Sequence, residues 1–154
     1  ETLVHQGAID VLGPVVNPVT VHQAKFSMGT VLALLAVHGA AGVKEFEAHF
    51  RDPEISDFRV RVSMALDQEV DTAYPARWIG KVSVQTLDGR TLHGKVDEPK
   101  GDPGNTLSRA EITDKAMRLA AFSGGATPSE MTTAIERLWN IRKQAKIGFL
   151  LPSN

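Results

Sequence analysis

The sequence contains no cysteine among its 154 residues, which excludes disulfides, thiolate zinc sites, iron–sulfur clusters and cysteine nucleophiles. It also lacks a long hydrophobic run. The longest apolar stretch, residues 31–37, is too short to span a bilayer. The first residues show no basic segment followed by an apolar one, as a secretory signal requires. We therefore expect a protein of a reducing compartment, the cytoplasm, without a membrane partner.

An excess of charge of one sign is also lacking. Lys and Arg total 17 and Asp and Glu total 18, for a net charge of −1. Domains that bind nucleic acid or anionic membranes usually carry a strongly basic surface, so we expect no nucleic acid among the partners. What is present is ordinary: 42% hydrophobic and 23% charged residues are typical of a globular chain that builds its own core.

Three helices are predicted from a hydroxyl residue placed three positions before Gln or Glu, the spacing of a capping box. In the first of them, the Thr20 hydroxyl is expected to accept the amide proton of Gln23 while the Gln23 side chain reaches back, and Gly39 is a suitable left-handed stop. A short helix is expected over residues 43–50, and Asp52-Pro53 opens a further helical turn. The three capped helices cover residues 21–38, 108–122 and 127–146.

The extended segments are predicted from alternation of apolar and polar residues. Residues 2–12 alternate poorly and residues 58–66 alternate clearly, whereas residues 67–75 are expected to form a polar loop. Residues 78–96 are predicted to form a hairpin with a three-residue loop at 87–89, because this register pairs Val84 with Leu92 on one apolar face.

The order of these elements predicts an α+β fold, with a mainly antiparallel sheet that carries helices on one face and with helices at the C-terminus. We expect residues 1–125 to form the α+β domain. Residues 126–154 would be a C-terminal helix and tail that pack on this domain or on a partner.

Motifs that would specify a reaction are absent. The sequence has no HExxH pair, no phosphate-binding GxxxxGK[ST] loop and no GxSxG elbow. The five histidines fall on four predicted elements, since only His22 and His38 share a helix, and a composite site is not indicated. We therefore expect no metal site, and no residue is assigned a catalytic role. Four basic residues have the chemistry to hold a carboxylate or phosphate, although solvated positions are the simpler expectation: Arg59, Arg61, Lys95 and Lys100.

One polar stripe interrupts the first capped helix. Gln23, Ser27 and Thr30 follow i, i+4, i+7 spacing and would share one face of a helix that is otherwise apolar. Polar groups on a buried helix need partners. These residues therefore either line a wet cleft, as substrate-binding residues, or bond to the neighbouring backbone.

A series of short motifs, in order along nearly the whole chain, resembles the C-terminal region of the MmgE/PrpD family. That family includes 2-methylcitrate dehydratase, cis-aconitate decarboxylase and iminodisuccinate epimerase. No single motif is decisive, but the series is fairly specific. Its members here are Ala24-Lys25-Phe26-Ser27-Met28, Asp52-Pro53, Val60-Arg61-Val62, Leu87-Asp88-Gly89-Arg90, Pro99-Lys100-Gly101-Asp102-Pro103 and Leu107-Ser108.

The resemblance implies an enzyme that acts on small di- and tricarboxylates, by proton abstraction next to a carboxylate, without a metal or organic cofactor. It implies a large N-terminal helical domain that supplies the catalytic His and Lys residues. This chain would be the lid over that site, roughly the last third of a protein that forms a homodimer. Alone it would be inactive.

The resemblance also implies that the stripe of Gln23, Ser27 and Thr30 faces the cleft between the two domains. If Ser27 is aligned with the family, Thr30 stands where the family tends to carry a Tyr that faces substrate. Thr keeps a hydroxyl but is too short to reach the same point, so the resemblance does not identify the substrate. The alternative function is a non-catalytic binding or oligomerisation module. Such a module would use the basic last helix and the apolar tail, residues 147–151.

Overall fold

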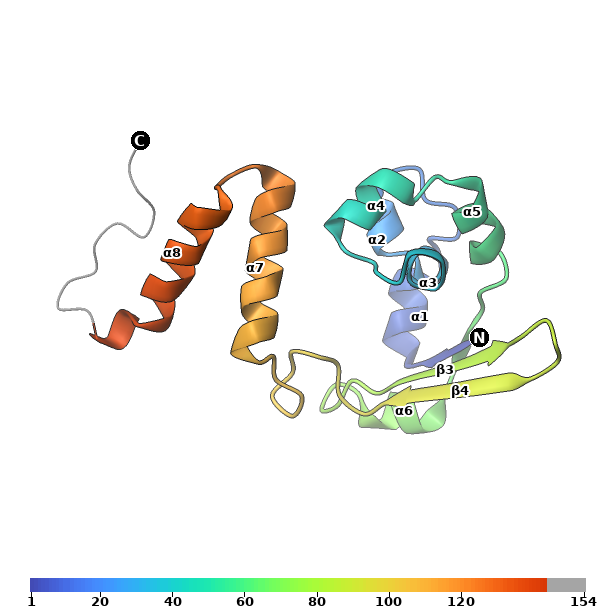
Figure 1. Cartoon of the computed structure of the whole chain (residues 1–154). Coiled ribbons are helices and arrows are strands. Elements are labelled where there is room, and N and C mark those ends of the chain that lie inside the picture. The colour runs from blue at the N-terminus through green and yellow to red at the C-terminus, as the bar shows by residue number, and fades with distance from the viewer. Residues whose placement is uncertain (144–154) are drawn as a thin grey trace. The chain divides into compact units, whose positions relative to one another are not determined.

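The computed structural model of the chain describes residues 1–143 (Figure 1). Residues Glu1–Asn105 form one compact unit, and the residues from Thr106 onward belong to a second. This division lies at residue 105, whereas the sequence places a boundary at residue 125. That residues 1–125 act together as a lid domain stays a prediction.

The first unit is built on a four-stranded sheet in the order β2-β1-β3-β4. Strand β1 pairs in parallel with β2, while the β1–β3 and β3–β4 pairs are antiparallel. The sheet is therefore mostly antiparallel, and the predicted α+β class is confirmed. The strands are β1 (Thr2–Val4), β2 (Met64–Leu66), β3 (Gly80–Gln85) and β4 (Thr91–Val96).

The β3–β4 hairpin has the predicted register. Val84 pairs with Leu92 and Val82 with Gly94. Thr86 donates its amide to the carbonyl of Arg90 at 2.9 Å, which leaves three residues in the loop. Gly89 has φ 85°, a left-handed conformation that glycine adopts without steric cost. The predicted register is confirmed, although Val84, Leu92 and Val96 on that apolar face remain exposed.

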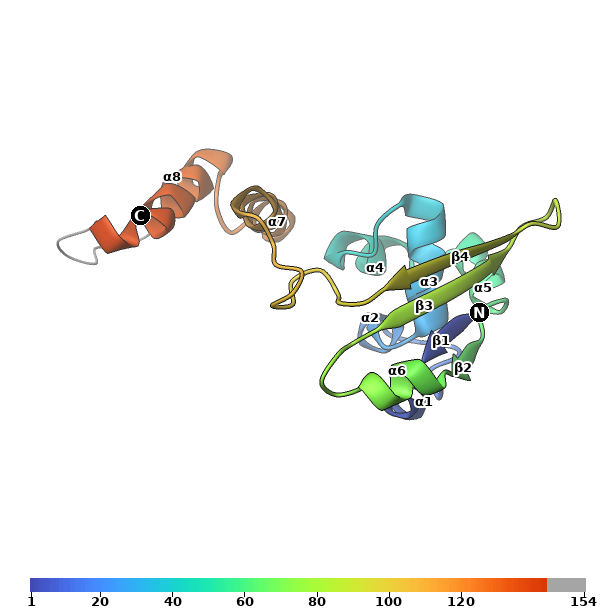
Figure 2. The same cartoon turned by 90° about the horizontal axis from the view of Figure 1, so that it is seen from below.

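Six helices of the first unit surround this sheet, and five of them gather on one face (Figure 1). The sixth, α6, lies on the opposite side of the sheet, in a segment where the sequence predicts only a loop (Figure 2). The buried cluster lies among the four of these helices that fall within residues 21–59, and it is made of apolar residues, Ala24, Ala33, Leu34, Phe46, Phe50 and Ile55. The helices are α1 (Gln6–Leu12), α2 (Val21–Lys25), α3 (Met28–His38), α4 (Val43–His49), α5 (Pro53–Arg59) and α6 (Gln68–Ala73).

Two predicted strands are largely wrong. The extended segment over 2–12 ends at Val4, because the His5 side chain accepts a hydrogen bond from the Ala8 amide at 3.1 Å and begins α1. The strand over 58–66 is reduced to Met64–Leu66, because α5 continues from Pro53 to Arg59. Phe58 packs against the buried cluster from that helix, so its burial needs no strand.

The second unit contains two longer helices, α7 (Arg109–Ser123) and α8 (Pro128–Trp139), and a 3-10 turn over Ile141–Lys143. Both predicted capping boxes, Ser108 with Glu111 and Thr127 with Glu130, are confirmed. Helix α8 ends at Trp139, earlier than predicted. Residues 144–146 and the apolar tail 147–151 lie outside the described residues.

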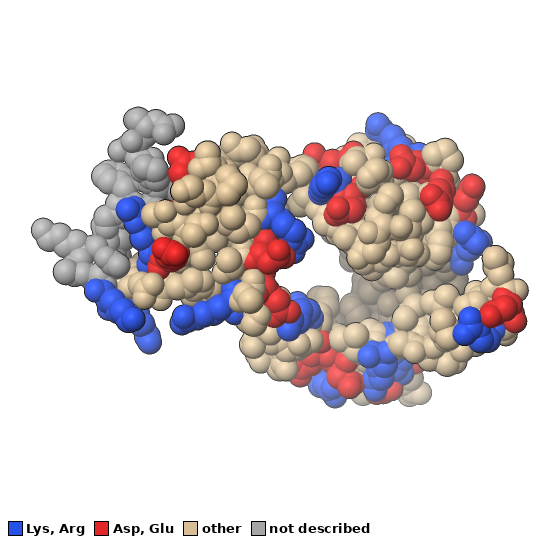
Figure 3. Space-filling model, viewed as in Figure 1, with Lys and Arg blue, Asp and Glu red and all other residues tan. Residues whose placement is uncertain are grey.

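Basic and acidic side chains are interspersed on the visible face of both units (Figure 3). Within residues 1–143, no helix combines the length and the hydropathy that crossing a bilayer demands.

Candidate functional site

The helix that carries the polar stripe is broken at Ser27. Helix α2 ends at Lys25 and α3 begins at Met28, so the single helix over 21–38 is wrong. Ser27 has an extended backbone, φ −102° and ψ 107°, and its hydroxyl accepts from the Thr30 amide at 3.3 Å. A serine hydroxyl in this position satisfies one of the unpaired amides at a helix start. Ser27 is therefore a helix cap instead of a mid-helix residue.

The three stripe residues consequently have three different environments. Gln23 is exposed on α2, where its side-chain oxygen accepts from the Val19 amide at 2.8 Å. Ser27 and Thr30 are buried, with 1% and 0% of their surface exposed. The Thr30 hydroxyl has no hydrogen-bond partner among the described residues. The structure thus brings Ser27 and Thr30 together and separates Gln23 from their helix.

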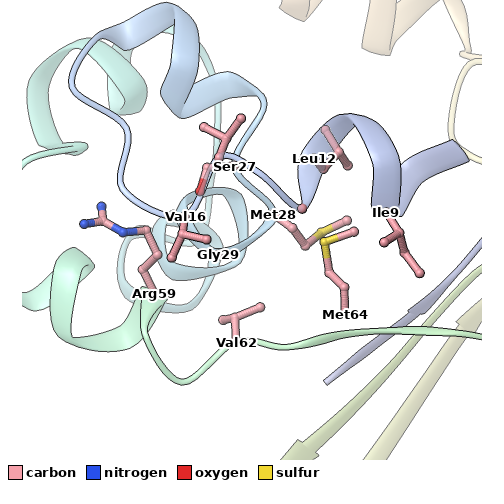
Figure 4. Close-up of a pocket in the computed structure, with 11 residues that line it drawn as sticks. Ile9, Leu12, Val16, Ser27, Met28, Gly29, Arg59, Val62 and Met64 are labelled. Atoms are coloured by element: carbon pink, nitrogen blue, oxygen red, sulfur yellow. The ribbon is translucent and has the colours of Figure 1, made fainter. Parts of the chain in front are cut away.

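Ser27 lines a pocket of about 230 Å³ that lies between α1, the start of α3, the end of α5 and β2 (Figure 4). One end is apolar, with the Met28 and Met64 thioethers close together, whereas Ser27 and the Arg59 stem lie on the other side and the Arg59 guanidinium extends away from Ser27. The other described lining residues are apolar or glycine: Ile9, Leu12, Gly13, Val15, Val16, Gly29 and Val62.

Arg59 is the last residue of α5, and its position depends on Gly29. A Cβ added at Gly29 would lie 2.6 Å from Arg59 Cγ and 3.0 Å from its carbonyl oxygen, so the arginine stem packs directly on the α3 backbone. Its Nη2 atom donates to Ser56 Oγ at 3.4 Å, while its buried Nε has no hydrogen-bond partner among the described residues. A buried guanidinium nitrogen without a partner is costly, so this N–H is suited to donate to an added acceptor.

This arrangement suits binding better than proton transfer. A guanidinium presents a rigid set of donors that matches a carboxylate, and a serine hydroxyl can add a further hydrogen bond. Among the described residues that line the pocket, none is His, Lys, Asp, Glu or Tyr. The pocket therefore has the chemistry to orient a small anion with an apolar portion, but it holds no general acid or base of its own.

The sequence predicts four basic residues with the chemistry to hold an anion, and it does not distinguish Arg59 from Arg61, Lys95 and Lys100. Arg61 stacks over the Phe58 ring at 5.2 Å and donates through Nε to the Asp57 carbonyl. Lys95 is paired with Glu69 at 2.7 Å on the opposite side of the sheet. The signal that separates Arg59 from these two is its packing on Gly29, which only the folded chain reveals.

A network of ion pairs joins α6 to the sheet. Lys81 contacts Asp67 at 2.8 Å and Glu69 at 2.7 Å. Lys81 donates a hydrogen bond to the Asp67 carboxylate, which lowers the pKa of Asp67 below its ordinary value and raises the pKa of Lys81. Asp67 also accepts from the Val70 amide as the cap of α6. These groups are satisfied by one another and fix α6 in place.

Replacing Asp67 by Asn is expected to destabilise the fold at pH 7 but not under acid conditions. Asn retains the helix cap, so the substitution removes mainly the ion pair. Because the pKa of Asp67 is lowered in the folded state, its stabilising contribution is present above the ordinary value of 3.8 and is lost as the pH falls through the lower folded value. Urea unfolding at pH 7, 5 and 3 measures this. Asp57→Asn, at an exposed carboxyl on α5, is the control, and a stability difference that stays constant with pH would contradict the assignment.

Comparison with protein-family models matches residues 1–141 to the model described as the MmgE/PrpD C-terminal domain. The match includes every helix and strand described above up to the end of α8. No curated protein matches the chain significantly.

Proposed function

Because the chain belongs to the MmgE/PrpD family, as its C-terminal domain, we propose that it forms the lid of a bipartite active site. The complete enzyme would be a lyase or isomerase of small di- or tricarboxylates. An N-terminal helical domain of the same protein would supply the catalytic His and Lys residues, and no cofactor would be needed. We further propose a homodimer in the cytoplasm, with neither nucleic acid nor a membrane as partner.

The observation that carries this proposal is the pocket at Ser27 and Arg59. Arg59 lines it, with a buried Nε that has no partner among the described residues, and Ser27 adds a hydroxyl beside an apolar wall, without an acid or base among the described lining residues. Those features support substrate binding and leave proton transfer to another part of the protein. A small carboxylate supplies the acceptor that Arg59 Nε lacks.

The roles of the individual residues follow from their positions. Ser27 and Arg59 would contact a substrate carboxylate directly. Thr30 has a buried hydroxyl without a partner among the described residues, one turn into α3, and would contribute once the substrate or the helical domain is in place. Gln23 is exposed at the surface of α2 and would meet substrate from the side of the helical domain.

Citrate, used as a tricarboxylate probe, is expected to bind the isolated chain weakly and to shift the amide resonances of Ser27 and Arg59. Arg59→Met should reduce this affinity by about tenfold or more, the loss of one charge-assisted contact worth about 1.5–3 kcal/mol. NMR titration measures it. Arg61→Met is the matched control, because Arg61 is exposed two residues away and packs on Phe58.

Two outcomes would contradict the lid proposal. One is equal citrate affinity in the Arg59 and Arg61 variants. The other is turnover of 2-methylcitrate or cis-aconitate by the isolated chain well above a heat-killed control, since a lid without the helical domain has no acid or base at its pocket.

The alternative is a non-catalytic binding or oligomerisation module, and it is favoured by the exposed apolar side chains of the second unit. Leu138 is 47% exposed and Ile141 39% exposed, although both are large and hydrophobic. Self-association in light scattering, together with no citrate binding, would support this module. A monomer that binds citrate through Arg59 would support the lid.

A further inference from the structure

Two histidines and one aspartate converge at the C-terminal end of α3, whereas the pocket described above lies at the start of that helix. His38 is the last residue of α3, His49 is the last residue of α4, and Asp52 immediately precedes α5. Gly39 adopts φ 71°, a left-handed conformation that ends α3 and turns the chain, and the end of α4 comes back to His38. The fold thereby unites groups that the sequence places on separate elements.

The distances among these three side chains are close to those of a metal centre. The His38 and His49 rings are stacked with centroids 4.2 Å apart, and His49 Nδ1 lies 2.9 Å from Asp52 Oδ2. One ligand atom from each residue lies within 4.8 Å of the others. Ligands that each lie about 2.1 Å from one zinc ion are separated by about 3.0–3.4 Å. The His49–Asp52 pair is slightly closer than that spacing, because it forms a hydrogen bond that the ion would replace. The exposed His38 ring would leave its stack on His49 to present a nitrogen to the same ion.

The electrostatic surroundings favour a cation at this position. Helices α3 and α4 both end here, and their last carbonyls carry partial negative charge next to the Asp52 carboxylate. The neighbouring basic residue, Arg51, is directed elsewhere, because its Nη2 donates to the Val19 carbonyl at 2.8 Å and its guanidinium lies over the Phe50 ring. It therefore does not neutralise the carboxylate.

We propose that His38, His49 and Asp52 bind a divalent transition-metal ion, with the remaining coordination positions occupied by water. Two imidazole nitrogens and one carboxylate suit zinc, cobalt and nickel, and do not suit calcium or magnesium, which prefer oxygen ligands. The ion would join the end of α3 to the junction between α4 and α5. This site is independent of the proposed lid function.

Zn²⁺ titrated into the untagged, metal-stripped chain is expected to bind at one ion per chain, measured by calorimetry, and to raise the thermal unfolding midpoint. Co²⁺ in place of Zn²⁺ should produce visible absorption bands from nitrogen and oxygen ligands. His38→Ala should weaken Zn²⁺ binding by about tenfold or more, because losing even an outer-shell partner of a metal typically costs that much.

His38 is exposed, so its substitution leaves the fold intact, and circular dichroism of the metal-free variant verifies this. His93→Ala is the matched control, since His93 is exposed on β4 and is not one of the three proposed ligands. Absence of Zn²⁺ binding, equal affinity in His38→Ala and the parent, or an equal loss in His93→Ala would each overturn the site.

Discussion

Leu34→Ala is expected to destabilise the first unit by about 2–5 kcal/mol, because it truncates a large side chain at the centre of the core. Leu34 is fully buried and belongs to the cluster that Phe46, Phe50 and Ile55 form beneath α3. Truncation removes the transfer free energy of the side chain and leaves a cavity that α3, α4 and α5 cannot close completely. Because domains are stable by only about 5–15 kcal/mol, much of the folding free energy would be lost.

Leu35→Ala is the matched control for this substitution. Leu35 is the next residue of the same helix but is 45% exposed, so its truncation should change stability by no more than about 0.5 kcal/mol. Urea unfolding in a Trp139→Phe background makes Trp78 a fluorescent reporter of the first unit alone. Similar losses of stability in Leu34→Ala and Leu35→Ala would show that Leu34 does not lie on the buried face of α3.

Gly29→Ala is expected to destabilise the first unit by up to about 2 kcal/mol, although alanine is the better helix former. Helix propensity alone would favour alanine by about 0.8–1.0 kcal/mol. The added Cβ, however, would lie 2.6 Å from Arg59 Cγ, which must move together with α5. Overpacking of this kind costs about 1–3 kcal/mol, so the steric term is expected to dominate. Displaced Arg59 should also bind citrate less well.

The coupling between Gly29 and Arg59 is measured by a double-mutant cycle with Arg59→Ala. Residues in contact show interaction energies of about 0.5–3 kcal/mol, and removal of the Arg59 side chain should relieve part of the cost of the alanine. Gly80→Ala is the control, because a Cβ there meets nothing within 4 Å. Additive effects at Gly29 and Arg59 would show that the arginine stem does not rest on α3.

These substitutions connect the core to the proposed substrate pocket. Leu34 holds α3 in place, α3 carries Ser27 at its start, and Gly29 receives the stem of Arg59. The pocket residues therefore sit on helices whose positions are set by packing, which is how a rigid binding site is supported. The other side of the sheet, where Lys81 pairs with Asp67 and Glu69, contributes stability instead of ligand contacts.

Local features of this protein were predictable from the order of its amino acids. The caps at Thr20, Ser108 and Thr127, the left-handed Gly39 and the three-residue hairpin loop each follow from a few neighbouring residues. Such features depend on hydrogen bonds between residues three positions apart or on the parity of one strand pair, so short-range patterns suffice. The ordered series of motifs also predicted the family, which the match over residues 1–141 confirms.

The positions at which helices break, and the polar groups that meet, depend instead on tertiary packing. The spacing of Gln23, Ser27 and Thr30 fits one continuous helix as well as it fits two helices. The chain forms two because Ser27 caps α3 where the chain turns into the core. The alternation over residues 58–66 suggested a strand, but burial of Phe58 in the helical cluster favoured continuation of α5. That continuation places Arg59 on Gly29 and so creates the pocket. Contacts between distant segments are cooperative packing events, and their outcome is not encoded in any local pattern.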